Sequence, residues 1–573
     1  LGMIGRGEHM KVRTYIESTV HHELSGNVID LCPVGALVSK PYRFTARAWE
    51  MTSVPLASPH DGTGSNLFGH VLRGRLMRVV PRENEAINEI WIADRDRFSY
   101  EGAYSEERLQ RPMIRRSGAQ EGSGNGPNDG QWVETDWETA LEAAARGLRG
   151  RGAQLGVLAS PSGTLEELYL AGRIARGLGG GNVDSRLRQH DFRDQGADPL
   201  YPNLGLRIAD IDSLQGLLIV GSNLRREAPI LAHRVRKAAR RGAKVALLNP
   251  AVFNYYFPVA AYVQSAPAAE VADLAAILRA AAEAAGAAVP PHLSAAVDGA
   301  KVNQQHRDAA AALASGDADA KRAVWLGALA LRHPRFADLR ALAAALAQVT
   351  GASLGVLAEG ANAAGAHLAG AVPHREAGGR PVSSPGLTAA EMLARPLKSY
   401  LLVGGVEPWA DSPGSDAARA LAQAELVVAV TPFTSEALRK VAHVLLPAGT
   451  FAETSGTYVN LEGVWQSQTG AAAPVGESRP GWKILRVLGN LLGLSGFEYQ
   501  SSEDVRAELA ALVGAPTEYS APAYSGRHTV GLQDGGQVAQ SVVDVPMYQI
   551  DALVRRAPSL QRTREGRTPA VTY

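Results

Sequence analysis

The chain has 573 residues, which is too long for a single core and predicts three or four domains. Its 58 Lys and Arg against 57 Asp and Glu give a net charge of +1, which argues against a nucleic-acid binder held by charge. One cysteine excludes a disulfide framework and fits a reducing compartment, and no apolar run reaches the ~18 residues of a membrane helix.

Residues 1–24 include the alternating stretch KVRTYI, which is typical of a strand. His21 and His22 follow it, close in sequence to the cysteine. Adjacent side chains in a strand point to opposite faces, so the two imidazoles do not readily chelate one metal. We expect them at the surface or supporting a metal ligand.

The only cysteine, Cys32, lies in SGNVIDLCPVGALVSKPYRF, residues 25–44, and Pro33 follows it directly. The proline fixes a tight turn, and Gly35 and Ala36 let backbone N–H groups approach the sulfurs of an iron-sulfur cluster. From these residues alone, a lone cysteine also fits a small buried apolar side chain. Both interpretations stay open on the residues themselves.

The segment from Ser25 to Trp49 resembles part of the large iron-sulfur subunit of bacterial NADH:quinone oxidoreductase, which is the G subunit of respiratory complex I. The resemblance implies that Cys32 is the fourth ligand of a [4Fe-4S] cluster whose other three ligands lie upstream in the family. It also implies a [2Fe-2S] and a further [4Fe-4S] cluster in that upstream region. We therefore expect a fragment that lacks its N-terminal ferredoxin-like part and does not hold the cluster alone.

Residues 44–115 resemble the small N-terminal domain of the molybdopterin oxidoreductase superfamily, in which four cysteines hold a [4Fe-4S] cluster. Within them, HVLRGRLMRVVPR alternates and breaks at glycine, which predicts a β-hairpin. The four cysteine positions are taken by Ser58, Asp61, Ser65 and Ala93. These groups cannot replace thiolates on soft iron-sulfur, so we expect the cluster to be lost, with ordinary turn hydrogen bonds in its place. A hard-cation site is disfavoured because too few carboxylates converge.

Strands and helices alternate beyond a Gly- and Ser-rich loop at 117–132, which predicts a doubly wound parallel sheet. Thr135 or Asp136 is expected to cap the helix that follows this loop. The clearest βαβ unit spans 214–250, with the turn Gly221-Ser222-Asn223. Backbone amides at such a turn could hold a phosphate, but no G-x-G-x-x-G or G-x-x-x-x-G-K motif is present, so we interpret the turn as a relic.

Residues 264–320 are Ala-rich and predict packing helices, and His367 is expected to be structural. A second strand-helix repeat opens at 398–409 and leads to Leu446-Pro447-Ala448 and Asn460-Leu461-Glu462-Gly463, which resemble the same superfamily. Glu453 and Glu462 could be proposed as an acid/base pair. Because no histidine or thiol accompanies them, we expect anchors that hydrogen-bond a glycine-rich turn.

The C-terminal part becomes rich in Ser, Gly and Pro from about residue 495, and we expect a reduced final segment whose last ten residues are a flexible tail. The fold class is predicted as α/β: a molybdopterin-oxidoreductase-like multi-domain body with doubly wound parallel sheets, preceded by a small mainly β domain. The expected divisions are 1–43, 44–115, 116–395, 396–495 and 496–573.

The resemblance implies an electron-transfer subunit that relays electrons from NADH and flavin towards quinone, coupled in the complex to proton translocation. It implies partners in the peripheral arm, including the flavin-bearing NADH-binding subunit, on the cytoplasmic face of the bacterial inner membrane. Neither an independent active site nor molybdopterin is expected, and quinone is reduced elsewhere in the complex. The alternatives are an active molybdopterin-dependent oxidoreductase of the formate dehydrogenase class and a non-redox scaffold.

Overall fold

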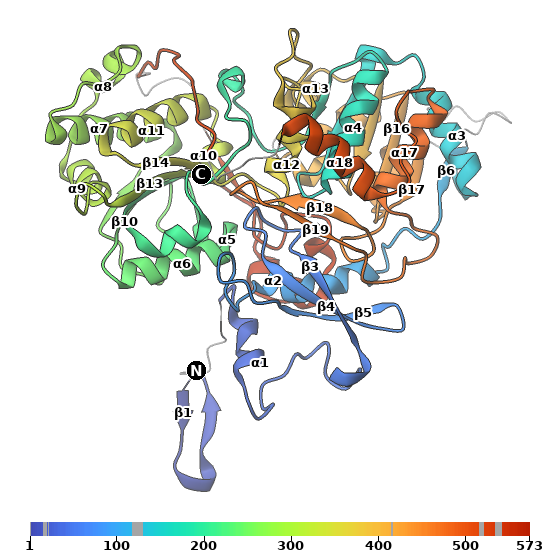
Figure 1. Ribbon diagram of the computed structural model, residues 1–573, viewed down its shortest axis with the longest axis horizontal. Helices are drawn as coiled ribbons and strands as arrows, with labels where there is room; N and C mark the ends of the chain where they lie inside the picture. The colour runs from blue at the N-terminus through green and yellow to red at the C-terminus, as the bar shows by residue number, and fades with distance from the viewer. Residues whose placement is uncertain are drawn as a thin grey trace.

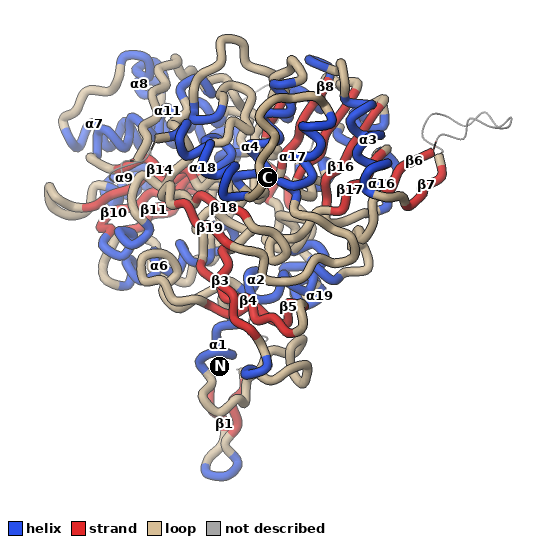
Figure 2. The backbone as a smooth tube through the Cα atoms, turned by 45° about the vertical axis from the view of Figure 1, so that its right-hand side comes forward, coloured by secondary structure: helices blue, strands red, loops and turns tan. Residues whose placement is uncertain are grey.

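The computed structural model describes residues 2–14, 20, 22–116, 130–413, 416–514, 521–532 and 541–573. Two α/β lobes lie side by side, a small β domain lies beneath them, and an N-terminal arm projects from the small domain (Figure 1). The arm also stands clear of the body when the molecule is turned by 45° (Figure 2). The predicted α/β class with parallel sheets is confirmed.

The first lobe contains a seven-stranded sheet in the order β7-β6-β17-β16-β15-β8-β9. Its strands are β6 (Met113–Arg116), β7 (Gln131–Glu134), β8 (Leu155–Ala159), β9 (Val183–Asp184), β15 (Ser399–Val403), β16 (Leu426–Thr431) and β17 (Val444–Pro447). The last five named run parallel, while β6 and β7 form an antiparallel edge. Strand β8 pairs with β15 from Leu155↔Ser399 to Ala159↔Val403, so the expected boundary at 395/396 separates strands of one sheet. The reason is that the chain between β9 and β15 leaves to build the second lobe.

Helices cover both faces of this sheet and bury its branched side chains. They are α3 (Trp137–Leu148), α4 (Leu165–Gly177), α12 (Ala363–Leu368), α13 (Ala389–Ala394), α14 (Pro408–Asp411), α15 (Ala417–Ala422), α16 (Glu436–Val441), α17 (Gly481–Leu491) and α18 (Ser502–Val513). Of the two caps expected for α3, the structure uses Asp136, whose carboxylate accepts a hydrogen bond from the Thr139 amide at 2.8 Å.

The second lobe contains a five-stranded, entirely parallel sheet in the order β12-β11-β10-β13-β14. Its strands are β10 (Leu214–Val220), β11 (Lys244–Asn249), β12 (Ala261–Gln264), β13 (Lys321–Leu326) and β14 (Ser353–Val356). Its helices are α5 (Leu224–Glu227), α6 (Pro229–Arg240), α7 (Pro267–Ala285), α8 (Ser294–Gly299), α9 (Gln304–Leu313), α10 (Ala328–Leu331) and α11 (Phe336–Thr350). The Ala-rich stretch is helical as predicted, and its small side chains let α7, α9 and α11 pack closely.

The small domain is the antiparallel sheet β3-β4-β5 with helix α2 (Asp94–Phe98) against it. Its strands are β3 (Thr52–Ala57), β4 (Asn66–Leu72) and β5 (Arg75–Pro81). The predicted hairpin is confirmed: Arg73 and Gly74 both have positive φ, 50° and 78°, as a tight two-residue turn between right-twisted strands requires.

The arm carries the hairpin β1 (Gly2–Ile4) and β2 (Lys11–Arg13) and the short helix α1 (Val28–Leu31). Near the C-terminus, β18 (Gly456–Val459) pairs with β19 (Trp465–Gln468), α19 spans Pro558–Gln561, and β20 (Val543–Asp544) pairs with β21 (Val571–Thr572). The expectation of a flexible tail is therefore wrong, because β21 gains backbone partners in β20. The loop predicted at 117–132 falls outside the described residues except for its end, where β7 has already begun.

No helix among the described residues is both long enough and apolar enough to cross a membrane.

Candidate functional site

The arm that carries Cys32 is held on the small domain by Asp94, the first residue of α2. One oxygen of its carboxylate accepts from the Gly26 amide and the other from the Ser25 hydroxyl, both at 2.6 Å. The side-chain amide of Asn27 donates from Nδ2 to the carbonyl of Ile92 at 2.8 Å. Burial raises the pKa of Asp94 to about 6, although these two donors favour its charged form. The start of α1 is therefore fixed beside Ala93, one of the positions expected to have lost a cluster ligand.

The Cys32 thiol lies directly after α1 and is half-exposed. Its Sγ accepts a hydrogen bond from the Leu37 amide at 3.4 Å, and the Gly35 amide closes the turn onto the Cys32 carbonyl at 3.3 Å. Gly35 has φ of 65°, which glycine adopts without steric cost. The backbone amides of this turn, that of Leu37 foremost, hold the pKa of the Cys32 thiol below its usual value. The turn predicted from Pro33 and Gly35 thus wraps amides around the sulfur, which suits a thiolate ligand.

Large apolar side chains around the thiol face solvent. The exposed fractions are 57% for Leu31, 82% for Val34, 37% for Leu37 and 46% for Val38, and further along the arm 94% for Phe44 and 78% for Trp49. Such a concentration of exposed apolar residues is typical of an interaction surface. A cysteine placed among them is not a buried core group, so that alternative interpretation of Cys32 is disfavoured.

His22 does not approach the thiol through any described contact. Its Nδ1 accepts from the Leu24 amide at 3.1 Å, and its ring stacks on Tyr256 at 5.6 Å between centroids. Next to it, Glu23 makes a bidentate ion pair with Arg225, with both contacts at 2.7 Å. These contacts tie the arm to the second lobe, consistent with the expected surface role of His22; His21 lies outside the described residues.

The expected relic cluster site is filled by hydrogen bonds. Ser58 donates from its hydroxyl to one oxygen of Asp96 at 2.5 Å, and the Ala93 amide donates to the other at 3.2 Å. Two of the four positions therefore bond one buried carboxylate, and a third, Ser65, accepts from the Ser58 amide through its carbonyl at 2.9 Å. The expected turn hydrogen bonds are confirmed at Ser58 and Asp61, whereas the buried Ser65 hydroxyl has no hydrogen-bond partner.

The fourth position, Asp61, forms a buried ion pair with Arg95. The same guanidinium donates to the carbonyl of Glu227 in the second lobe at 2.7 Å. Asp61 also receives the Thr63 amide at 2.8 Å. These side chains offer no sulfur to iron, and no group of three His, Cys, Asp or Glu side chains suited to a metal occurs among the described residues.

A cavity of about 230 Å³ lies where the small domain, both lobes and the C-terminal segment meet. Its wall includes the turns after β8, β15 and β17 of one sheet and after β10, β13 and β14 of the other. Ligands of open parallel sheets bind outside the carboxyl ends of the strands, so the cavity has the position of a ligand site. Sequence reasoning missed it, because its wall comes from segments far apart in the chain.

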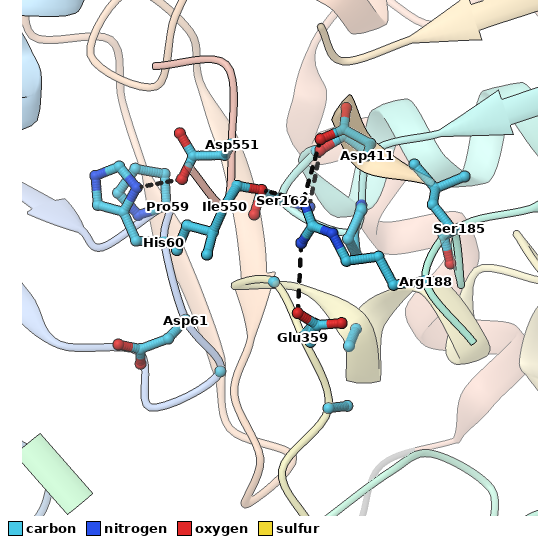
Figure 3. Close-up of a pocket in the computed structure, with 18 of the residues that line it drawn as sticks. Pro59, His60, Asp61, Ser162, Ser185, Arg188, Glu359, Asp411, Ile550 and Asp551 are labelled. Atoms are coloured by element: carbon cyan, nitrogen blue, oxygen red, sulfur yellow. Dashed lines mark hydrogen bonds and ion pairs between the residues drawn. The ribbon is translucent and has the colours of Figure 1, made fainter. Parts of the chain in front are cut away.

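Several charged groups of the cavity wall pair with each other, Arg188 among them (Figure 3). Arg188 contacts Glu359 at 3.4 Å and Asp411 at 3.2 Å, and it donates to the carbonyl of Ile550 at 2.7 Å. Arg332 forms a second ion pair with Glu359. Although burial would raise the pKa of Glu359, the two guanidinium groups keep it below its usual value. Arg188 and Arg332 are therefore neutralised by carboxylates of the cavity wall.

Carboxylates of the chain also accept hydrogen bonds from backbone amides in the turns that follow the strands. Glu227 accepts from the Asn223 and Ala328 amides, each at 3.0 Å. Glu453 accepts from the Thr450 amide at 2.6 Å and from Arg108 at 2.7 Å, as expected of a carboxylate that anchors a turn. A second anchor, Glu462, accepts from the Ile208 amide. His367 is buried and bonded through Nδ1 to the Ala363 carbonyl at 3.0 Å, as expected of a structural histidine.

A family model described as molybdopterin oxidoreductase matches residues 108–491, which cover both lobes. The chain belongs to the molybdopterin oxidoreductase family. A solved structure of similar fold, acetylene hydratase from Pelobacter acetylenicus, superposes with a TM-score of 0.55 over 78% of this chain and 70% of that one, at 13% identity. The predicted molybdopterin-oxidoreductase-like body is thereby confirmed as a fold.

Two further family models match the N-terminal part of this family member. Residues 1–38 match the ferredoxin-like domain of NADH-quinone oxidoreductase subunit 3, and residues 58–101 match the 4Fe-4S domain of NADH-ubiquinone oxidoreductase NDSU1/NuoG-like proteins. Curated relatives, each described as the G subunit of NADH-quinone oxidoreductase, are 35% identical over 251 residues in Rickettsia felis and 34% over 244 in Rickettsia typhi. These matches cover 44% and 42% of this chain and about a third of each relative.

The residues present do not fit two of the groups that these families imply. The family-model match at 58–101 reflects the sequence of the domain around the site and not its cluster ligands. No thiolate is present there, because the four ligand positions hold Ser58, Asp61, Ser65 and Ala93. A pterin dinucleotide carries a pyrophosphate, which would compete with Glu227 and Glu453 for the turn amides. Cys32, the one cysteine, does not line the cavity. An active molybdopterin-dependent enzyme is therefore disfavoured by the donor set.

Proposed function

We propose that this chain is an electron-transfer subunit of an NADH:quinone oxidoreductase in which Cys32 supplies one thiolate of a [4Fe-4S] cluster. The observation that carries the proposal is the half-exposed Sγ with the Leu37 amide directed at it. The likeness of residues 1–38 to a ferredoxin-like domain and the relatives from NADH-quinone oxidoreductase support the same assignment. A [4Fe-4S] cluster takes up and releases one electron at a time.

The chain's own residues hold and tune the ligand. The Leu37 amide stabilises the thiolate against protonation, because a hydrogen bond to the charged form lowers the thiol pKa. Asp94 fixes the start of α1, and Glu23 with Arg225 fixes the arm against the second lobe. The sulfur is thereby held at a set position relative to the body.

The remaining three ligands come from outside the described residues, on a polypeptide segment that packs over Leu31, Val34 and Val38. Burial of these side chains would also exclude water from the cluster, which is one determinant of its reduction potential. The two lobes serve as a scaffold in this proposal, without an active site of their own.

The assembled enzyme is proposed to lie at the cytoplasmic face of the bacterial inner membrane, with the flavin-bearing NADH-binding subunit among its peripheral partners and quinone reduced on another subunit. These assignments rest on the named relatives, of which the matched stretch spans about a third.

The test replaces Cys32 in the whole complex. With Cys32→Ala we expect loss of one [4Fe-4S] electron-paramagnetic signal and slow NADH:quinone activity, while NADH oxidation by an artificial acceptor at the flavin persists. Cys32→Ser offers a harder oxygen, so we expect the cluster lost or its potential shifted. An assembled Cys32→Ala complex with full quinone activity and an unchanged spectrum would refute the proposal.

A further inference from the structure

One carboxylate bridges the turns of two neighbouring parallel strands. Oε1 of Glu227 accepts from the Asn223 amide and Oε2 from the Ala328 amide, each at 3.0 Å. Asn223 follows β10 and Ala328 follows β13, and these strands are paired in the five-stranded sheet. The two amides therefore converge on one small anion that the chain itself supplies.

Glycine makes the close approach of the two turns possible. A Cβ on Gly327 would come within 2.8 Å of Oε2 of Glu227 and within 2.3 Å of Cβ of Ser222. Gly221 has φ of 61°, and a Cβ there would meet the Ala330 amide at 2.4 Å. Any side chain at either position would push the turns apart, so the spacing of the amides depends on both glycines.

Two further groups face the same carboxylate. The Ser222 hydroxyl is fully buried and has no hydrogen-bond partner, yet it lies close enough to Glu227 to favour its charged form. The charge of the buried Arg332 acts in the same direction. Burial nevertheless raises the pKa of Glu227 to about 7. Ser222 therefore adds a buried hydroxyl beside a carboxylate that is poorly solvated.

The site opens on the cavity, because Asn223, Glu227 and Ala328 all contribute to its wall. A small oxyanion in the cavity could reach both amides if the Glu227 side chain were absent. Converging backbone N–H groups with a nearby guanidinium are the groups that bind phosphate and carboxylate in proteins.

We propose that the turns after β10 and β13 form a binding site for a small oxyanion, such as phosphate or a short carboxylate, and that Glu227 occupies this site. The consequence is selectivity: the cavity excludes phosphate-bearing ligands because its best anion site is filled from within. Arg332 and Arg188 do not replace it, since both are paired with Glu359. This inference does not depend on Cys32.

The test removes the internal anion from the full chain. Inorganic phosphate and acetate are titrated calorimetrically, in chloride buffer of constant ionic strength, into wild type, Glu227→Ala and Glu270→Ala. We expect saturable binding of both anions to Glu227→Ala, a rise of its melting temperature by at least about 2 °C on saturation, and no binding to wild type.

Glu270 is the matched control, because it is equally an acid of the second lobe, only 1% exposed, but has no hydrogen-bond partner on either oxygen. No donor bonds either oxygen of the Glu270 carboxylate, so Glu270→Ala should bind neither anion. Absence of binding to Glu227→Ala, or equal binding to Glu270→Ala, would overturn the proposal. If Glu227→Ala does not fold in chloride buffer, its soluble yield is measured in phosphate buffer instead. Recovery of folded protein in phosphate supports the site, and failure to recover it refutes the site.

Discussion

Nδ1 of His60 lies 2.8 Å from Oδ2 of Asp551, which joins the small domain to the C-terminal segment across one wall of the cavity. On its other side, Nε2 of His60 lies 2.7 Å from the hydroxyl of Ser99. The row resembles an acid–histidine–serine triad, but Ser99 is fully buried and does not line the cavity, so no substrate reaches it. The arrangement acts as a tether.

We predict that Asp551→Ala loosens residues 541–573 at a cost of about 1.5–3 kcal/mol, the range for a hydrogen bond to a charged group. The measurement is limited trypsin digestion: the variant should be cleaved faster within residues 541–573 and at an unchanged rate elsewhere. The matched control is Glu436→Gln, which breaks the exposed Glu436–Lys440 pair and should cost less than about 1 kcal/mol. Equal effects of the two substitutions would contradict the tether.

The tether is also predicted to fail in acid. Burial would raise the pKa of Asp551, but His60 and Arg555 lower it to about 2, below its ordinary 3.8. A depressed carboxyl pKa stabilises the folded form above the unfolded pKa, and this stabilisation is lost as the pH falls through the folded pKa. Hydrogen exchange of 541–573 should therefore increase between about pH 4 and pH 2 in wild type. The same step in Asp551→Ala would rule out this carboxyl as its cause.

Asp61 and Ser65 are predicted to respond in opposite ways to alanine. Asp61→Ala leaves the buried Arg95 without its carboxylate and should cost about 3 kcal/mol. Ser65→Ala removes a buried hydroxyl that has no partner and should be neutral or slightly stabilising. Urea unfolding measures both, and iron content should not change in either variant. Loss of an iron signal would mean that this site still holds a cluster.

Local signals in the sequence predicted the elements that depend on near neighbours. The hairpin at Arg73 and Gly74, the cap of α3 and the turn after Cys32 each rest on residues within a few positions of one another. The pairing of Leu155 with Ser399 could not be predicted in this way, because no local pattern indicates that the partner of a strand lies beyond an inserted lobe.

The candidate site shows the same division. The turn around Cys32 was predicted because it is encoded in consecutive residues, whereas His60, Asp551 and Glu227 gain their contacts only from distant segments of the chain. A partial signal existed for Glu227, which lies four residues after Asn223 on the first turn of α5. Its second contact, with Ala328, has no counterpart in the sequence pattern.

Leu37→Pro is predicted to raise the pKa of the Cys32 thiol. Proline has no amide hydrogen, so the hydrogen bond that contributes most to the lowered pKa disappears. The rate of alkylation by iodoacetamide near neutral pH should fall, and its pH midpoint should move upward. Leu37→Ala keeps the amide and is the control, expected to react as wild type does. A midpoint unchanged by proline would show that the Leu37 amide does not hold the thiolate.

Glu270→Gln is predicted to stabilise the second lobe in neutral and alkaline solution. Burial raises the pKa of Glu270 from 4.5 to about 8, with Asp273 adding to the rise. A raised carboxyl pKa means that the unfolded chain loses this proton first, so wild-type stability falls as the pH rises from about 4.5 to 8. The difference in unfolding free energy between pH 5 and pH 8, measured with urea, should be a few kcal/mol smaller in the variant than in wild type. Parallel pH profiles for the two proteins would show that Glu270 ionises normally.

The interrupted sheet of the first lobe sets an order of events during synthesis. Strand β8 leaves the ribosome long before its partner β15. Until β15 is made, the edge of β8 that pairs with it stays open, although all five residues of β8 are buried in the finished fold. The five-stranded lobe between them has a complete sheet of its own, so it can fold while β8 remains unpaired on that edge. Nascent chains stopped before residue 399 therefore combine a finished lobe with an open, apolar strand edge, which is the stage at which chaperone binding and aggregation compete.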